Sequence, residues 1–110
     1  MKIFDITNMI PQTNYSLSRQ YKPEGICYHV TGDSTRGQAV SWFKNPTAQV
    51  SAHYVIEKNG DVFLCVHPDH KAYHCGIVNK ATAQIYFDKG QLNPNNYLIG
   101  IECVSSGALS

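Results

Sequence analysis

Gly25-Ile26-Cys27-Tyr28-His29-Val30-Thr31 is a run of β-branched, aromatic and small residues that Gly32 closes. These residue types favour a β-strand, so we predict a buried strand over residues 25–31. A second run of the same character, YLIGIECV, occupies residues 97–104 and is followed by Ser105-Ser106-Gly107. The sequence therefore predicts two buried strands that lie far apart along the chain.

A helix is predicted between these strands, over residues 35–44. Asp33 and Ser34 are suitable N-caps, and Asn45-Pro46 ends the helical pattern. The apolar side of this helix comprises four residues, of which the two aromatic ones are interpreted as core: Ala39, Val40, Trp42 and Phe43.

A hairpin is predicted next, with strands at 52–57 and 61–66 on either side of Lys58-Asn59-Gly60. Asn-Gly is a strong hairpin signal because both residues tolerate a positive φ. The order strand, helix, hairpin, strand indicates an α/β fold with a mixed central β-sheet and flanking helices.

The remaining segments give weaker signals. Residues 1–24 are interpreted as an irregular arm, and residues 77–96 as a long loop with a short element near 84–87. A buried sheet normally has helices on both faces, yet the sequence offers one good helix candidate. We therefore expect a single domain over 1–110 that is truncated at its C-terminal end.

Composition excludes several classes of protein. The chain has 110 residues, a net charge of +1 and 43% hydrophobic residues, which suits one folded domain. This charge balance excludes a strongly basic nucleic-acid module and a basic membrane-surface protein. No apolar run approaches the ~20 residues of a membrane span, and the N-terminus lacks the apolar core of a signal peptide.

The four cysteines form no CxxC pair, and no secretory signal implies a disulfide framework. The four are Cys27, Cys65, Cys75 and Cys103. Three of the four lie in or beside apolar runs, so the cysteines are interpreted as small buried hydrophobic residues.

His29 and Glu102 are polar residues inside apolar strands. A ring in such a strand must be hydrogen-bonded or bind a metal, and a satisfied core or surface histidine is as good an interpretation of His29 as a metal ligand. A desolvated Glu102 has a raised pKa that suits a general acid or base. The alternative is a strand end at which Glu102 reaches water.

A local cluster is formed by His67, His70, His74 and Cys75. The three histidines would share one face of a helix, and this spacing resembles that of metal ligands. Pro68 argues against such a helix, and a polar loop with one or two substrate-facing histidines is the favoured interpretation.

Taken together, the segments resemble the zinc-dependent N-acetylmuramoyl-L-alanine amidases, the type related to phage lysozyme-amidases and peptidoglycan recognition proteins. The order and spacing of the blocks make the resemblance specific, and an N-terminal arm at 3–11 adds to it. Four blocks carry it: GICYHVTG at 25–32, SAHYVI with NGDVF at 51–63, KAYHCG at 71–76 and LIGIE at 98–102.

The resemblance implies a fold and a chemistry. His29 would be a zinc ligand, and Glu102 would be the catalytic acid/base. His53 and His74 would lie in or under the groove that binds substrate. The implied reaction is hydrolysis, assisted by Zn²⁺, of the amide between N-acetylmuramic acid and L-alanine in peptidoglycan.

The sequence also departs from the family pattern. Ala52 stands where some relatives have a catalytic Tyr, and no His follows His74 to complete the zinc site. One protein ligand does not hold a catalytic zinc, so we expect a C-terminal fragment or a second chain to supply the others.

Two other functions stay open. One is a peptidoglycan-binding module without a complete zinc site, and the other is a small metal-binding protein that uses the local cluster at 67–75. Without an export signal, the resemblance implies an endolysin made in the cytoplasm that acts on the cell wall, or an enzyme that recycles wall fragments.

Overall fold

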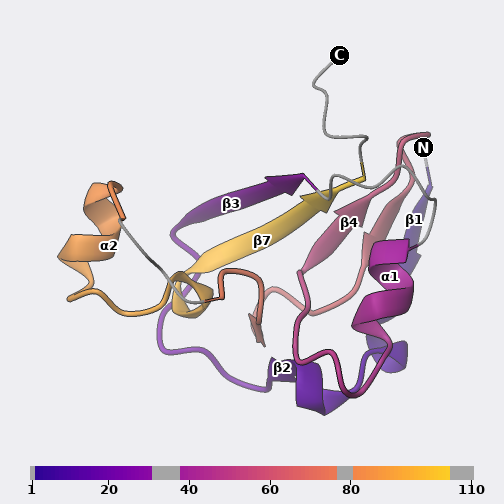
Figure 1. Cartoon of the computed structure of the whole chain (residues 1–110), viewed down its shortest axis with the longest axis horizontal. Helices are drawn as coiled ribbons and strands as arrows, with labels where there is room; N and C mark the ends of the chain where they lie inside the picture. Colours follow the sequence, from indigo (N-terminus) through magenta and orange to yellow (C-terminus); the bar gives the residue numbers. More distant parts are fainter. Residues whose placement is uncertain (1, 31–37, 77–80, 105–110) are drawn as a thin grey trace.

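The computed structural model describes residues 2–30, 38–76 and 81–104, and its centre is a five-stranded sheet (Figure 1). The strand order is β1-β5-β4-β7-β3. The bounds are β1 Ile3–Asp5, β3 Gly25–Val30, β4 Tyr54–Ile56, β5 Val62–Leu64 and β7 Leu98–Cys103.

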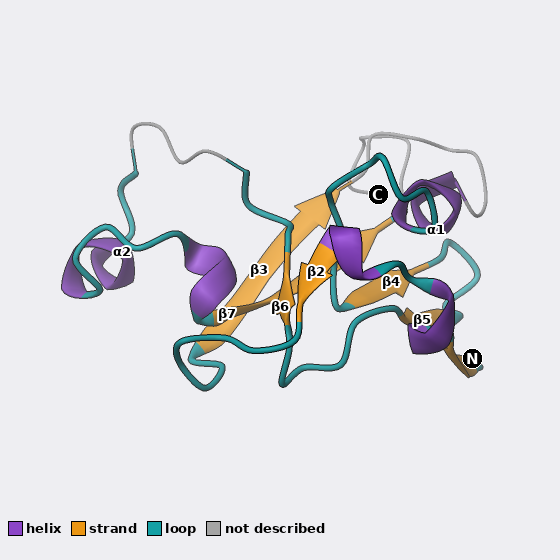
Figure 2. Cartoon of the chain, turned by 90° about the horizontal axis from the view of Figure 1, so that it is seen from below, coloured by secondary structure: helices purple, strands orange, loops and turns teal. Residues whose placement is uncertain are grey.

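Smaller elements surround this sheet. A two-stranded ribbon pairs β2 (Tyr15–Ser16) with β6 (Lys71–Ala72). Figure 2 places the two α-helices at opposite ends of the molecule, α1 (Gln38–Phe43) beside β4 and β5 and α2 (Gln84–Asp88) beyond β3. Three 3-10 turns complete the described elements: η1 Thr7–Met9, η2 Gln12–Asn14 and η3 Pro94–Asn96.

Strand directions confirm the mixed sheet that the sequence predicts. The β4–β5 pair is antiparallel, whereas β3–β7, β4–β7 and β1–β5 are parallel. The hairpin turn contains Gly60 at φ +90°, which a residue without a Cβ adopts easily. The predicted strands at 25–31 and 97–104 become β3 and β7; Thr31 and residues 35–37 of the predicted helix lie outside the described residues.

The interpretation of residues 1–24 as an irregular arm is wrong for the two short strands that the segment contains, β1 and β2. β1 pairs in parallel with β5, and Phe4 stacks on Phe63 with ring centroids 5.0 Å apart. A three-residue strand that leaves all its side chains exposed shows no alternating pattern, so its sequence carried no signal for a strand.

The prediction that the first strand is buried also needs correction. β3 is the last strand at one side of the described sheet, and one of its faces is open. Ile26 is 65% exposed and Tyr28 is 61% exposed. The other face of the strand carries Cys27 and His29, which are partly buried.

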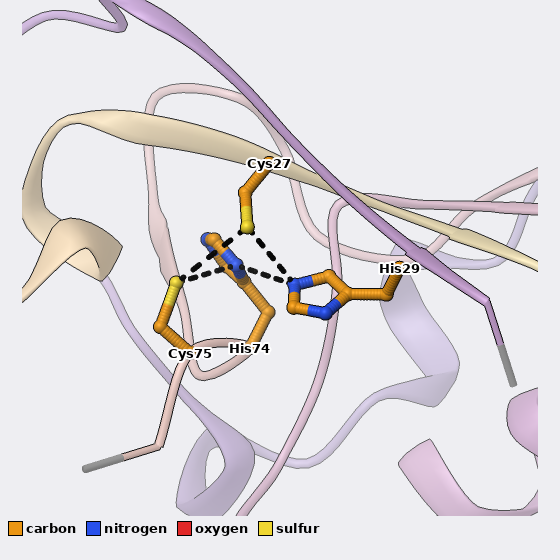
Figure 3. A group of neighbouring side chains, drawn as sticks. All are labelled: Cys27, His29, His74 and Cys75. Atoms are coloured by element: carbon orange, nitrogen blue, oxygen red, sulfur yellow. Dashed lines mark hydrogen bonds between the residues drawn. The ribbon is translucent and has the colours of Figure 1, made fainter. Parts of the chain in front are cut away.

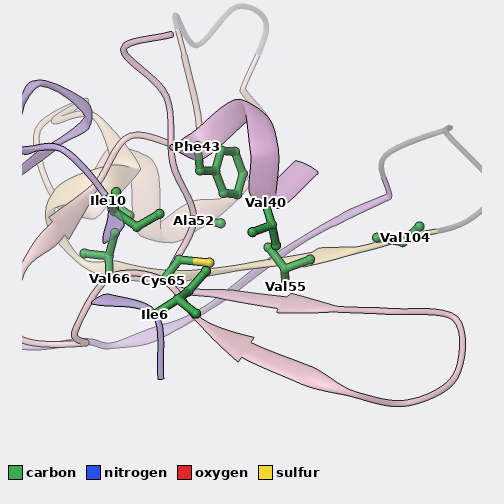
Figure 4. Close-up of a cluster of buried hydrophobic side chains, with 10 residues drawn as sticks. Ile6, Ile10, Val40, Phe43, Ala52, Val55, Cys65, Val66 and Val104 are labelled. Atoms are coloured by element: carbon green, nitrogen blue, oxygen red, sulfur yellow. The ribbon is translucent and has the colours of Figure 1, made fainter. Parts of the chain in front are cut away.

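The core lies between α1, the N-terminal segment and the sheet (Figure 4). Val40 and Phe43 of α1 pack into it, which confirms Phe43 as core, but Trp42 is 50% exposed and its core assignment is wrong. The buried cluster comprises Ile6, Ile10, Val40, Phe43, Ala52, Val55, Cys65, Val66, Ala72 and Val104. Among the described residues, no helix has the length and apolarity needed to cross a membrane.

Candidate metal centre

Four metal-binding side chains meet between β3 and the loop that follows β6 (Figure 3). Cys27 and His29 alternate along β3 and therefore point to the same face of the sheet. His74 and Cys75 approach them from the loop. The ligand atoms of all four side chains lie within 4.8 Å of one another, so the group could hold a metal ion.

The distances within this group are short. Nε2 of His29 lies 3.3 Å from Sγ of Cys27 and 3.3 Å from Nδ1 of His74. Sγ of Cys75 lies 3.2 Å from the same Nδ1 and 4.0 Å from Sγ of Cys27. Two sulfur and two imidazole donors form a set that suits zinc.

The Asn95 side chain, in the turn η3, holds the loop in place. The amide N–H groups of His74 and Cys75 both donate to Oδ1 of Asn95, each at 3.0 Å. The His74 ring lies directly over Gly100 of β7, where an added Cβ would come within 2.5 Å of Cγ of His74. Asn95 and Gly100 therefore determine where the His74 ring can lie.

Burial governs the protonation of this group. It lowers the pKa of His74 to about 4, and the neighbouring His53 and His29 lower it further, so the ring is neutral and able to bind a metal at neutral pH. Burial and the adjacent Cys27 raise the pKa of the Cys75 thiol to about 12. Because a bound cation removes a thiol proton outright, the cysteines would bind as thiolates.

The Glu102 side chain lies on the same face of the sheet as the four metal-binding side chains. It is in register with His29 on the neighbouring parallel strand, so both side chains share a face. Burial raises the pKa of its carboxyl group, and His29 opposes that shift. Glu102 lines a cavity of about 660 Å³ together with nine other residues: Ala39, Trp42, Phe43, Val50, Ser51, Tyr73, His74, Cys75 and Gly76.

His53 lies beneath the group and is fully buried. Its Nδ1 accepts the backbone N–H of Gly100 at 3.0 Å, which leaves Nε2 to donate to the His70 carbonyl at 2.8 Å. Nη2 of Arg19 donates to the same carbonyl at 2.6 Å. Burial lowers the pKa of His53 to about 4. His53 has no exposed surface with which to contact a substrate, whereas His74 lines the cavity.

The local cluster predicted around residues 67–75 divides in the structure. His74 and Cys75 belong to the metal-binding group, but His67 and His70 do not. The His70 ring stacks on Tyr15 with centroids 5.7 Å apart, and both histidines line a separate cavity. The local cluster therefore does not form a single metal site among the described residues.

Sequence reasoning missed Cys27 as a member of the group, and it considered Cys75 only within the local cluster at 67–75. The interpretation of the cysteines as buried core residues is correct for Cys65, while the other three are only partly buried. The signal that could have found Cys27 is its i, i+2 spacing from His29, which places both on one face of a strand. For Cys75 it is the adjacency to His74.

Comparisons with known proteins agree on one family. The N-acetylmuramoyl-L-alanine amidase family matches residues 19–109. N-acetylmuramoyl-L-alanine amidase A of Achromobacter lyticus is 34% identical over 93 residues, a match that covers 84% of this chain and 51% of that protein. The chain therefore spans about half the length of this relative.

Solved structures share the fold. A mutant endolysin from Bacillus subtilis superposes with a TM-score of 0.68 at 21% identity, over 94% of this chain and 61% of the endolysin chain. An AmpD derivative gives 0.69 at 20% identity, over 99% and 64%, and PlyL gives 0.66 at 17% identity, over 100% and 62%. The fold of the solved structures agrees with the match to the family and with the 34% identical relative. The chain belongs to the N-acetylmuramoyl-L-alanine amidase family.

Proposed function

We propose that the chain carries the active site of a peptidoglycan hydrolase that cleaves the amide between N-acetylmuramic acid and L-alanine. The observation that supports this most is the register of β3 and β7, which aligns His29 with Glu102. A metal-binding imidazole and a partly buried carboxyl group thus share one face of the sheet. The family membership supports this choice of substrate.

The residues fit the zinc ion that the family implies. The two imidazole nitrogens of His29 and His74 lie 3.3 Å apart, and both rings come from backbone that the sheet and Asn95 hold in place. In this proposal both histidines hold the metal. Zinc bound there would supply Lewis-acid polarisation of the scissile carbonyl.

Glu102 provides the proton transfers. A carboxylate with a raised pKa takes a proton from the attacking water and then donates it to the amine of L-alanine as the amide bond breaks. The cavity beside it gives the substrate a place to bind, with the exposed Trp42 ring and Tyr73 in its wall. His53 positions β7 from below by accepting the Gly100 amide, so we assign it a supporting role.

Replacing the carboxyl group tests this proposal. We predict that Glu102→Gln lowers the rate of amide cleavage by about 10²-fold or more, the usual contribution of a general base. Zinc binding should be unchanged, because Glu102 is not one of the four grouped donors. The assay counts new amino groups released from purified peptidoglycan.

Glu24→Gln is the matched control, since Glu24 pairs with Lys89 at 2.7 Å and does not line the cavity. It should cleave at the wild-type rate. Equal rates for Glu102→Gln and wild type would contradict the role of Glu102. Wild-type binding to peptidoglycan without cleavage would instead favour the peptidoglycan-binding module.

We also propose an endolysin-like place of action, on the intact cell wall. The similarity in fold to a Bacillus subtilis endolysin supports it. Intact wall sacculi should then be cleaved at least as readily as soluble muropeptides. Cleavage confined to the soluble fragments would favour an enzyme that recycles wall material.

A further inference from the structure

We propose that Cys27 and Cys75 bind zinc together with His29 and His74, so that this chain alone supplies a complete Cys2His2 set. The inference rests on the proposed function for the identity of the metal, and it adds the two thiols as ligands. It also replaces the expectation that a further segment or second chain must supply every ligand except His29.

The first argument is geometric. Zinc binds sulfur at about 2.3 Å and nitrogen at about 2.0–2.1 Å, so a tetrahedral site has edges of about 3.8 Å (S–S), 3.5 Å (S–N) and 3.3 Å (N–N). The two sulfurs lie 4.0 Å apart and the two nitrogens 3.3 Å apart. The two Sγ–N distances of 3.3 and 3.2 Å complete the comparison. These four of the six edges lie within about 0.3 Å of the tetrahedral values, and all six pairs lie within 4.8 Å.

The second argument concerns hydrogen bonding. Nδ1 of His74 faces both Nε2 of His29 and Sγ of Cys75, while Nε2 of His29 also faces Sγ of Cys27. A neutral imidazole nitrogen has either one proton or one lone pair, so it cannot bond well to two such neighbours at once. A single cation at the centre satisfies all four groups together.

The charges agree with this assignment. Two thiolates and two neutral imidazoles balance a divalent cation, which matters in a partly buried group. A set of four protein ligands is closed, whereas catalytic zinc sites keep one position open. Metal binding by the four side chains is therefore measured separately from cleavage.

Cobalt(II) is the probe for the thiol ligands, because a thiolate bound to cobalt gives an intense charge-transfer band in the near ultraviolet. We expect wild type to develop this band with one equivalent of Co²⁺. Cys27→Ser and Cys75→Ser should each weaken the band, and the double variant should lose it. Cys103→Ser is the matched control, because that thiol contacts Tyr28 and is not one of the grouped donors.

A band that is absent from wild type, or that persists in the double variant, would overturn the proposal. Wild-type protein gives an independent measurement should a variant fail to fold. Zinc should protect Cys27 and Cys75 from alkylation by iodoacetamide but leave Cys103 unprotected. If Cys27 and Cys75 are labelled equally with and without zinc, the proposal is also overturned. Glu102→Gln should keep the cobalt band while losing cleavage, which separates failure of this inference from failure of the proposed function.

Discussion

At the scale of single residues, the site depends on a glycine, Gly100, at a position where a Cβ would not fit. Gly100 leaves room on β7 for the His74 ring, and its backbone N–H donates to His53 underneath. A Cβ at this position would meet the ring at 2.5 Å, a separation that real Cβ contacts do not show. Asn95 accepts the backbone N–H of His74 and so fixes the loop that carries the ring, which limits how far the ring can move.

We predict that Gly100→Ala weakens metal binding at least tenfold, because displacing His74 removes one ligand. Isothermal titration with Zn²⁺ measures this directly. Gly25→Ala is the control on the neighbouring strand, since its Cβ would meet the end of a flexible Leu98 side chain at 3.1 Å. Wild-type zinc affinity in Gly100→Ala would show that the His74 ring is not a ligand.

At the scale of elements, Asn14 joins the N-terminal segment to the chain that follows α1. Its side-chain amide donates to the carbonyls of Phe43 and Asn45 at 2.8 and 2.9 Å. Its Oδ1 accepts the N–H of Gln49, which has a positive φ of 54°. A fully buried Asn14 thus satisfies three backbone groups at the end of α1 and in the chain that follows it.

Asn14→Ala should lower the free energy of unfolding by about 2–4 kcal/mol, because it removes one buried and two partly buried hydrogen bonds to the backbone. Urea unfolding followed by circular dichroism gives this value. The exposed Asn8 offers the comparison, and Asn8→Ala should change stability by no more than about 0.5 kcal/mol. A similarly small effect of Asn14→Ala would mean that α1 is held by its apolar contacts alone.

Elements differ in how well the sequence predicts them. β3, β7 and the hairpin follow from apolar runs and from Asn59-Gly60, because burial and turn chemistry leave local patterns. β1 leaves no such pattern, since its pairing with β5 comes from a partner far along the chain.

The residues of the site likewise divide into those that a local sequence pattern reveals and those that only the folded chain brings together. His29 and Glu102 could be singled out because each is a polar residue within an apolar strand. The group of four donors could not, because His29 and His74 are 45 residues apart and meet only once the chain is folded. Arg19 and the His53 network were missed for the same reason.

At the scale of the whole molecule, stability should depend on pH through the buried histidines. Burial lowers the pKa of His53 to about 4, from 6.5 in an unfolded chain. Below pH 6.5 the unfolded chain binds a proton that the folded chain excludes, so stability falls with falling pH until about pH 4. His74 shifts in the same direction.

We therefore predict a lower free energy of unfolding at pH 4.5 than at pH 7, measured by urea unfolding with a chelator present. His53→Gln should reduce this pH dependence, although the variant will be less stable at pH 7 because its hydrogen bonds to Gly100 and His70 change. Equal stability of wild type at the two pH values would contradict the burial of neutral rings.

The central claim is zinc-dependent cleavage of the bond between N-acetylmuramic acid and L-alanine. Incubating the wild-type chain with purified peptidoglycan and zinc, then identifying the new chain ends by mass spectrometry, tests it most directly. We predict new L-alanine amino termini, no new reducing sugar ends, and loss of the product when a chelator is added. New sugar ends, cleavage that survives the chelator, or no cleavage at all would contradict the claim.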